Sequence, residues 1–261
     1  MTLRDRIVAA LDRHPRLAIA VSGGVDSMTL AHLAARDSRA VVTMYHAASP
    51  AVPASARARV EDHAARFGWR LEVIDAGELA DDRYRANPVD RCYWCKTNLY
   101  DRIASVTGDP IASGTNRDDL SDFRPGLRAA REHDVVHPYV EAGATKRDVY
   151  ELAQSLGLTD LARLPAQPCL SSRVETGIAI DPADLAFIDG VESALAAALG
   201  AGAVVRCRVT HRGIVVEVGD ASREGEARAI ALQACSDAGR TFAGVRAYVR
   251  GAAFLHERKT A

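Results

Sequence analysis

The sequence has 261 residues, of which 33 are Lys or Arg and 34 are Asp or Glu, so its formal net charge is −1. A chain of this length allows one large domain or two smaller ones, and 48% apolar residues are enough for a globular core. The near-neutral charge, without a long run of Lys or Arg, argues against an extended nucleic-acid surface. Without a membrane-length apolar stretch or a signal-peptide core, the sequence suggests a cytoplasmic protein.

Helices and strands are predicted to alternate in the first part of the chain. Thr2 is a candidate N-cap for a helix over Thr2–His14. Thr145, with Asp148 three residues later, has the pattern of a capping box for a helix ending before Gly157. Further helices are expected at Ala54–Phe67, after Pro53 and before Gly68, and at Lys96–Val106; strands are expected at Leu17–Val21, Val41–Tyr45, Leu71–Ile74, Pro110–Ser113 and Val135–Val140.

This alternation is typical of an α/β fold, in which a parallel sheet carries helices on both faces. Pro138 interrupts the last predicted strand, which therefore suits an edge position. The stretches 81–95 and 114–126 are polar and rich in turn residues, and we interpret both as loops.

The pattern changes towards the end of the chain. Helices are predicted at Pro182–Leu199 and Ala221–Ala238, and strands at Val204–Val209, Ile214–Val218 and Phe242–Val249, which together describe a small α+β unit. We place the boundary near Thr176–Asp181, which gives domains at residues 1–176 and 177–261. The alanine-rich helix Pro182–Leu199 suits either an interface or the core of the small domain.

A glycine turn between the first strand and the following helix is the strongest functional signal. Glycines allow the backbone to approach an oxyanion closely, and the amides at a helix N-terminus attract negative charge. Asp26 would repel a phosphate, so its place is beside a metal ion or a ribose. An ordinary strand-to-helix turn is the simpler alternative. The candidate ATP-binding residues in this turn are Ser22, Gly23, Gly24, Val25, Asp26 and Ser27.

The segment S-G-G-V-D-S lacks the lysine of the G-x-x-x-x-G-K-[ST] phosphate loop. It resembles the PP-loop of the ATP pyrophosphatase superfamily. That resemblance implies cleavage of ATP between the α- and β-phosphates, with adenylation of an oxygen of the substrate.

The five cysteines argue for metal or redox chemistry rather than a disulfide framework in a reducing compartment. Cys92 and Cys95 form C-Y-W-C, and Cys169 lies in P-C-L-S-S-R. If both segments are loops at the carboxyl ends of parallel strands, the three thiols can converge. Three thiolates suit a [4Fe–4S] cluster with one open iron, although a redox pair, a structural role and a zinc site completed by His133 or His137 remain alternatives. Cys207 and Cys235 suit buried, structural positions.

Several motifs together resemble one family, the LarE ATP-dependent sulfur transferases. They are the glycine turn, NPVDRCYWCK (Asn87–Lys96), GTNRDDLSDFRPG (Gly114–Gly126), EAGATK (Glu141–Lys146) and PCLSSRVETG (Pro168–Gly177). The resemblance implies adenylation of the carboxylates of pyridinium-3,5-biscarboxylic acid mononucleotide and their conversion to thiocarboxylates, during synthesis of the nickel-pincer nucleotide. It also implies a homo-oligomer.

The family has two branches, which differ in their source of sulfur. In one, a lone cysteine matching Cys169 gives up its sulfur; in the other, three cysteines hold a [4Fe–4S] cluster whose free iron carries a hydrosulfide. Because Cys92, Cys95 and Cys169 are all present, the resemblance favours the second branch. The C-terminal stretch from Arg250 departs from the family pattern.

Further residues receive roles on the same basis. Asn116, Asp118, Asp119 and Asp122 match a GTN-x-DD-x-x-D motif and include candidate ligands of ATP and Mg²⁺, with Arg124 as a possible partner of the aspartates. Alternatively, they cap a helix or lie on a solvated loop. Arg173 is a candidate for the α-phosphate or the substrate carboxylate, or for a structural ion pair. Lys96 and Lys146 are motif lysines without an assigned role, and Trp94 would shield a cluster, stack on a pyridinium ring or belong to the core.

Arg206 and Arg208 flank Cys207 in a predicted strand, whose two-residue period puts both side chains on one face. In the family, a matching R-x-R pair binds the 5′-phosphate of the mononucleotide; two solvent-exposed edge arginines are the alternative.

Three other functions compete with sulfur transfer. A tRNA thiolase also combines a PP-loop with three cysteines, but it needs a basic RNA-binding surface. An amidotransferase-type synthetase would leave the cysteines structural, and a nucleotide-sensing module would have no turnover.

Overall fold

The computed structural model describes residues 1–121, 124–165, 167–200 and 202–249. The chain forms two compact units. The first comprises residues 1–81 and 90–167, and the second comprises residues 82–89 together with the chain from Pro168. The short segment 82–89 therefore leaves the first unit and contributes to the second.

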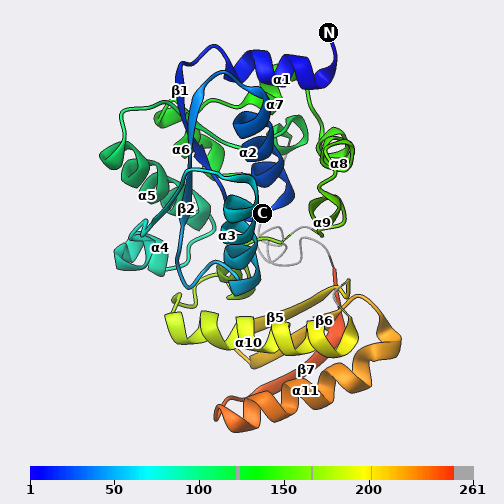
Figure 1. Ribbon diagram of the computed structural model, residues 1–261. Helices are drawn as coiled ribbons and strands as arrows, with labels where there is room; N and C mark the ends of the chain where they lie inside the picture. Colours follow the sequence, from blue (N-terminus) through cyan, green and yellow to red (C-terminus); the bar gives the residue numbers. More distant parts are fainter. Residues whose placement is uncertain (122–123, 166, 201, 250–261) are drawn as a thin grey trace. The chain divides into compact units, whose positions relative to one another are not determined.

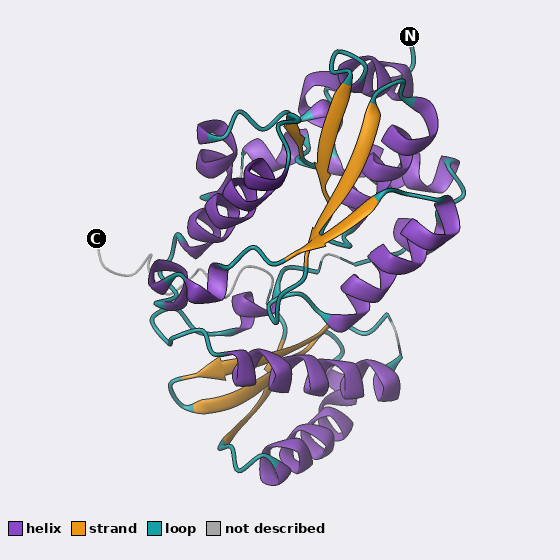
Figure 2. Ribbon diagram, turned by 60° about the vertical axis from the view of Figure 1, so that its left-hand side comes forward, coloured by secondary structure: helices purple, strands orange, loops and turns teal. Residues whose placement is uncertain are grey.

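The first unit is built on a four-stranded parallel sheet, which confirms the predicted α/β class (Figure 2). The strand order is β3-β2-β1-β4. The strands are β1 (Arg16–Ala20), β2 (Val41–Ala47), β3 (Leu71–Ile74) and β4 (Ile111–Ala112). With its flanking helices, this sheet is consistent with a PP-loop-like α/β fold.

Alternation along β1 explains why helices cover both faces of the sheet. Leu17 and Ile19 are buried in one apolar cluster, whereas Ala18 and Ala20 are buried in another. The first cluster draws on α1 (Leu3–Leu11), α2 (Val25–Asp37), α3 (Ala54–Phe67), α7 (Pro138–Ala142), α8 (Lys146–Ser155) and α9 (Thr159–Ala162). The second draws on α5 (Arg91–Val106) and α6 (Gly126–Glu132).

Helix ends follow the predicted caps. The side chain of Thr145 accepts from the Asp148 amide and the Asp148 side chain accepts from the Thr145 amide, which completes the capping box. Thr2 caps α1 in the same way. Gly68 ends α3 in the left-handed conformation, at φ +65°.

Two predictions between residues 81 and 140 are wrong. Residues 135–140 do not form a strand: only Val136 pairs with β4, through an isolated bridge, and Pro138 then begins α7. Proline suits the first turn of a helix because its missing amide hydrogen has no partner there. The segment 81–95 is not all loop, because α5 begins at Arg91 and α4 (Asp82–Arg85) precedes it. Short 3-10 turns η1 (Glu78–Ala80) and η2 (Arg117–Leu120) complete this unit.

The second unit contains the predicted α+β elements. Its sheet has the order β5-β6-β7, in which β5 (Val205–Thr210) is antiparallel to β6 (Gly213–Val218), and β6 is parallel to β7 (Phe242–Ala247). Helices α10 (Pro182–Leu199) and α11 (Glu224–Asp237) pack on it. The apolar side chains Leu185, Ile188, Val191 and Leu195 of α10 are buried. The 3-10 turns are η3 (Leu170–Arg173) and η4 (Ala221–Arg223).

In the part of the chain that the structure describes, none of the helices has the length and apolar character needed to cross a membrane.

Candidate functional site

The glycine turn links β1 to α2, and close packing requires one glycine in the turn and another beside it. Gly23 has φ +80°, and a Cβ there would lie 2.5 Å from the carbonyl oxygen of Ala56 at the start of α3. A Cβ on Gly114, which follows β4, would lie 2.7 Å from the Ser27 nitrogen. Neither position has room for a side chain, so three segments meet closely around the turn.

The two serines of the turn have different surroundings. Ser27 is buried; its Oγ accepts from the Ser22 amide at 3.0 Å and donates to the Gly24 carbonyl at 3.2 Å. Ser22 is exposed and contacts the Ser27 hydroxyl at 3.1 Å. Ser27 therefore fixes the shape of the turn, whereas Ser22 is accessible to a ligand.

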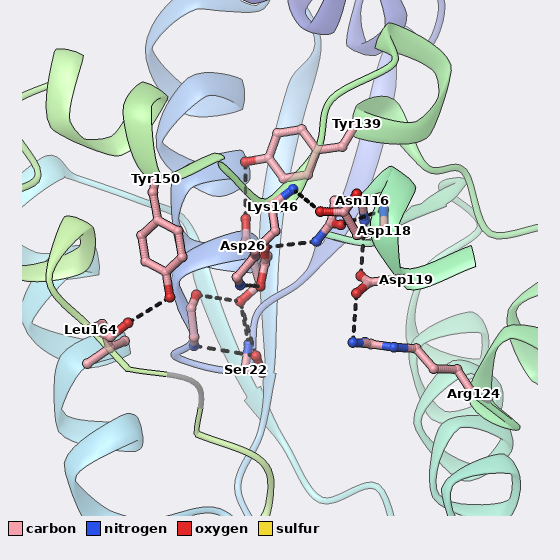
Figure 3. Close-up of polar contacts among 12 residues, drawn as sticks. Ser22, Asp26, Asn116, Asp118, Asp119, Arg124, Tyr139, Lys146, Tyr150 and Leu164 are labelled. Carbon is pink, nitrogen blue, oxygen red and sulfur yellow. Dashed lines mark hydrogen bonds and ion pairs between the residues drawn. The ribbon is translucent and has the colours of Figure 1, made fainter. Parts of the chain in front are cut away.

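Asp26, in the first turn of α2, is the centre of a polar network (Figure 3). One carboxylate oxygen forms an ion pair with Lys146 Nζ, and the other accepts from Asn116 Nδ2 at 3.2 Å. The Tyr139 hydroxyl donates to the Asp26 carbonyl at 3.1 Å. Burial raises the pKa of Tyr139 well above its usual value, so this hydroxyl keeps its proton and remains a donor.

The motif after β4 continues this network. Asn116 caps η2 by accepting from the Asp118 amide, and Asp119 Oδ2 accepts from the Asn116 amide at 3.1 Å. Arg124 pairs with Asp119 at 2.7 Å, as expected. Asp118 accepts from the Lys146 amide at 2.9 Å. The capping alternative thus describes the local structure, and it places two aspartates close to Asp26.

Asp119 is 8% exposed, and this burial raises the pKa of its carboxyl group. The neighbouring Asp26 acts in the same direction, whereas the Asn116 amide, Arg124 and Lys146 oppose it. A nearby cation would stabilise the ionised form of this buried carboxyl group. Asp122 lies outside the described residues.

Among the described residues, no three His, Cys, Asp or Glu side chains form a group that could hold a metal by themselves. Mg²⁺ at nucleotide sites takes one or two carboxylates and completes its shell with phosphate oxygens and water. Asp26 and Asp119, linked through Asn116, offer a suitable oxygen donor set for that arrangement.

The cysteines occupy two kinds of environment. Cys92 and Cys95 lie three residues apart in the first turns of α5, and Cys169 precedes η3 in the second unit. These three are half-buried, whereas Cys207 and Cys235 are buried as predicted. Burial raises the pKa of the Cys207 and Cys235 thiols, which disfavours thiolate chemistry there. None of the five is in a disulfide.

Arg173 forms the structural ion pair that the sequence left as an alternative. The guanidinium is 3% exposed and binds Glu192 through two bonds of 2.9 and 3.0 Å. It also donates to the carbonyl oxygens of Pro168 and Cys169. These contacts position the backbone around Cys169, and a direct role of Arg173 at a phosphate or carboxylate stays a prediction.

Arg206 and Arg208 both lie on β5, with Arg206 opposite Glu217 on β6. Arg208 makes an ion contact of 2.7 Å with Glu217, a side chain that is 1% exposed. Arg246 on β7 binds the same carboxylate at 2.7 and 3.0 Å. Burial lowers the pKa of Arg206, and the like charges of Arg173 and Arg208 add to this effect. Glu192 acts in the opposite direction, and Glu217 offsets part of the charge of Arg208 and Arg246.

Sequence reasoning did not assign Lys146, Tyr139 or Glu217 to a site. Lys146 had a usable signal, because the Thr145 capping box predicts that it occupies the first helical position of α8. Tyr139 contacts Asp26, which lies 113 positions earlier in the chain, and Glu217 contacts Arg208 on the neighbouring strand. No pattern in the sequence marks either contact.

The fold and these polar residues define a PP-loop-like α/β protein with a carboxylate and lysine network beside a glycine turn. No family model matches the chain. It is 37% identical over 166 residues to an uncharacterized protein of Synechocystis, a match that covers 62% of each chain. The chain thus spans about three fifths of that relative's length.

Two more distant relatives extend this comparison. An uncharacterized protein of Methanocaldococcus jannaschii is 28% identical over 187 residues, or 70% of each chain. The pyridinium-3,5-bisthiocarboxylic acid mononucleotide synthase of Lactiplantibacillus plantarum is 29% identical over 202 residues, or 74% of this chain and 72% of the synthase.

Proposed function

We propose that this protein is an ATP-dependent sulfur transferase of the LarE type, acting on pyridinium-3,5-biscarboxylic acid mononucleotide. The similarity to the synthase from Lactiplantibacillus plantarum supports the substrate class. The observation that carries the proposal is the junction of Asp26, Lys146 and Asn116 at the glycine turn. It brings a carboxylate and a cation to the helix N-terminus at the carboxyl end of β1, the place where parallel sheets commonly bind nucleotides, which supports the proposal.

In the first step, a substrate carboxylate oxygen attacks the α-phosphorus of ATP. The bond to the bridging oxygen of the β-phosphate breaks, and pyrophosphate leaves with its electron pair. Asp26 and Asp119 would hold Mg²⁺ against the phosphates, and Lys146 would neutralise charge on the leaving group. The carboxylate gains an AMP leaving group in place of oxide.

In the second step, hydrosulfide attacks the carbonyl carbon of the acyl-adenylate and AMP leaves, which yields the thiocarboxylate. Repetition on the other carboxylate consumes a second ATP and a second hydrosulfide. A [4Fe–4S] cluster with one iron free of protein ligands would supply the bound hydrosulfide. By the resemblance, Cys92, Cys95 and Cys169 would be its ligands, and each of them is a half-buried thiol outside a disulfide.

Arg206 and Arg208 would bind the 5′-phosphate of the substrate, which is consistent with the basic face formed by β5 and Arg246 on β7. We further propose a homo-oligomer, on the basis of the resemblance alone.

The cluster is tested by measuring iron and acid-labile sulfide after anaerobic purification. We expect about four of each per chain. Cys92→Ala, Cys95→Ala and Cys169→Ala should each lose most of both, whereas Cys235→Ala, a change on α11, should retain them. A parent protein without iron after reconstitution would contradict the cluster. Loss of the mass of one sulfur from Cys169 after a single turnover would then identify it as the donor.

A further inference from the structure

Arg59, on the second turn of α3, contacts the glycine turn and is not part of the network around Asp26. Its Nη1 donates to the carbonyl oxygen of Gly23 at 2.7 Å. Helices α2 and α3 lie on the same face of the sheet (Figure 1). Gly23 is in close contact with Ala56 in the first turn of α3. The position of Arg59 beside the turn is therefore fixed by packing.

The partners of Arg59 are unusual for a half-buried cation. Among the described residues, the one other contact of Nη1 besides Gly23 is with the side-chain oxygen of Gln167, at 3.4 Å. Within the described residues no carboxylate lies within ion-pair distance of this guanidinium; Asp160 attracts it from farther away and itself binds His63. By contrast, Arg57 on the same helix pairs with Glu61 at 2.8 Å.

Burial lowers the pKa of Arg59, because the charged form loses hydration without gaining an anion in return. A desolvated cation is stabilised most by an ion that carries several negative charges. The turn next to Arg59 presents backbone amides but contains no lysine. Arg59 thus provides the positive charge that the S-G-G-V-D-S segment itself lacks.

We propose that Arg59 binds the pyrophosphate portion of a nucleoside triphosphate at the glycine turn, an inference that rests on the proposed nucleotide-binding function. The planar guanidinium forms two-pronged bonds with phosphate oxygens. It would neutralise the charge that develops on pyrophosphate as the bond to the α-phosphate breaks. Arg59 is then a ligand of the leaving group, on the α3 side of the turn.

The test is isothermal titration calorimetry with three probes: α,β-methylene-ATP with Mg²⁺, pyrophosphate with Mg²⁺, and AMP. Arg59→Met should weaken binding of the first two probes by about tenfold or more, because a charge-assisted bond is lost, and change AMP binding by less than about twofold. Arg59→Lys keeps the charge but loses the two-pronged geometry, so it should give an intermediate effect on the same two probes. Arg57→Met is the matched control on the same helix and should bind all probes like the parent.

The outcomes distinguish a failure of the proposed nucleotide-binding function from a failure of the role of Arg59. A parent protein that binds neither α,β-methylene-ATP nor pyrophosphate would contradict the nucleotide function and, with it, the role of Arg59. Binding by the parent that is unchanged in Arg59→Met, or that falls equally for AMP, would overturn the role of Arg59 alone. Thermal unfolding identifies a misfolded variant; if Arg59→Met fails to fold, Arg59→Lys decides by the same comparison.

Discussion

Asp26 and Lys146 neutralise each other beside the glycine turn. The ammonium group binds one oxygen of Asp26, while Asn116 occupies the other. In the proposed function, Mg²⁺ and Lys146 would therefore compete for this carboxylate. If Asp26 holds Mg²⁺ as proposed above, Lys146 would be released towards the phosphates, and both charges would then act on ATP.

Lys146→Met should therefore weaken both ATP binding and turnover. We expect pyrophosphate release in the presence of the mononucleotide to fall about 10- to 100-fold, because a charge-assisted contact to phosphate is lost. A coupled pyrophosphate assay measures this rate. Arg147→Met is the neighbouring control, since Arg147 is exposed and, among the described residues, forms its ion pair with Glu151 one turn along. Equal rates for parent and Lys146→Met would exclude contact between Lys146 and the phosphates.

Single residues differ in how much of their role the sequence reveals. The glycines and Asp26 could be identified because a strand, a turn and a helix start coincide there. Arg173 could not be resolved between ligand and ion pair, because its partner Glu192 lies on a separate helix and no local pattern links them. Arg59 had no signal at all, since an arginine on an amphipathic helix is ordinary.

Among the elements, α8 matters because it carries Lys146 in its first turn, so the cap of this helix also positions the lysine. Hydrogen bonds from the side chain and amide of Thr145 lower the pKa of Asp148. An acid whose pKa is lower in the folded state stabilises that state at pH values above its unfolded pKa. The contribution is lost as the pH falls through the folded-state pKa.

Asp148→Asn should thus remove an acid-sensitive part of the stability. Near neutral pH the variant should be less stable by about 1 kcal/mol or less, the range of a helix cap. The difference from the parent should shrink below about pH 4, where Asp148 begins to be protonated. Urea unfolding at a series of pH values measures it, and a difference that stays constant from pH 7 to pH 3 would contradict this explanation.

Helices with clear ends could be located from sequence alone. The bounds of α3 and α10 match the prediction, because proline or aspartate marks the start and glycine the end. The apolar run at 135–140 could not be assigned, since a short run suits a strand and a buried helix equally. The start of α5 at Arg91 was missed although Asp90, a common N-cap residue, precedes it; in the structure Asp90 makes no side-chain cap bond.

At the scale of the whole molecule, Asn87 joins two distant stretches of the second unit. It is fully buried, and its amide group donates to the carbonyl oxygens of Val174, Glu175 and Ile178 at 3.3, 2.9 and 3.0 Å. Its φ of +51° also suits asparagine better than most residues. The segment 82–89 is thereby attached to the stretch that follows Cys169.

Asn87→Ala should lower the free energy of unfolding by about 2–4 kcal/mol, because buried carbonyl groups lose their donor and alanine disfavours the positive φ. Asn87→Gly removes the hydrogen bonds but tolerates the backbone, so it should be less destabilised by about 1 kcal/mol. Chemical denaturation of both variants separates the two effects. If Asn87→Ala unfolds like the parent, the attachment of segment 82–89 does not contribute to stability.

The discontinuous second unit was beyond sequence reasoning. A composition change near Thr176 suggested a single boundary, whereas residues 82–89 belong with the later part of the chain. Only tertiary contacts such as those of Asn87 reveal this, because eight residues with turn composition carry no periodic pattern of their own.

This chain path has a consequence for the order of folding during synthesis. Every residue of the first unit has been made by Gln167, so its sheet and helices can assemble before most of the second unit exists. Residues 82–89 must wait until the chain has grown past Ile178 before Asn87 finds its partners. We therefore expect the first unit to fold early and the second to fold late. The two segments of the second unit would then come together after residues 90–167, which separate them in the sequence, have already folded.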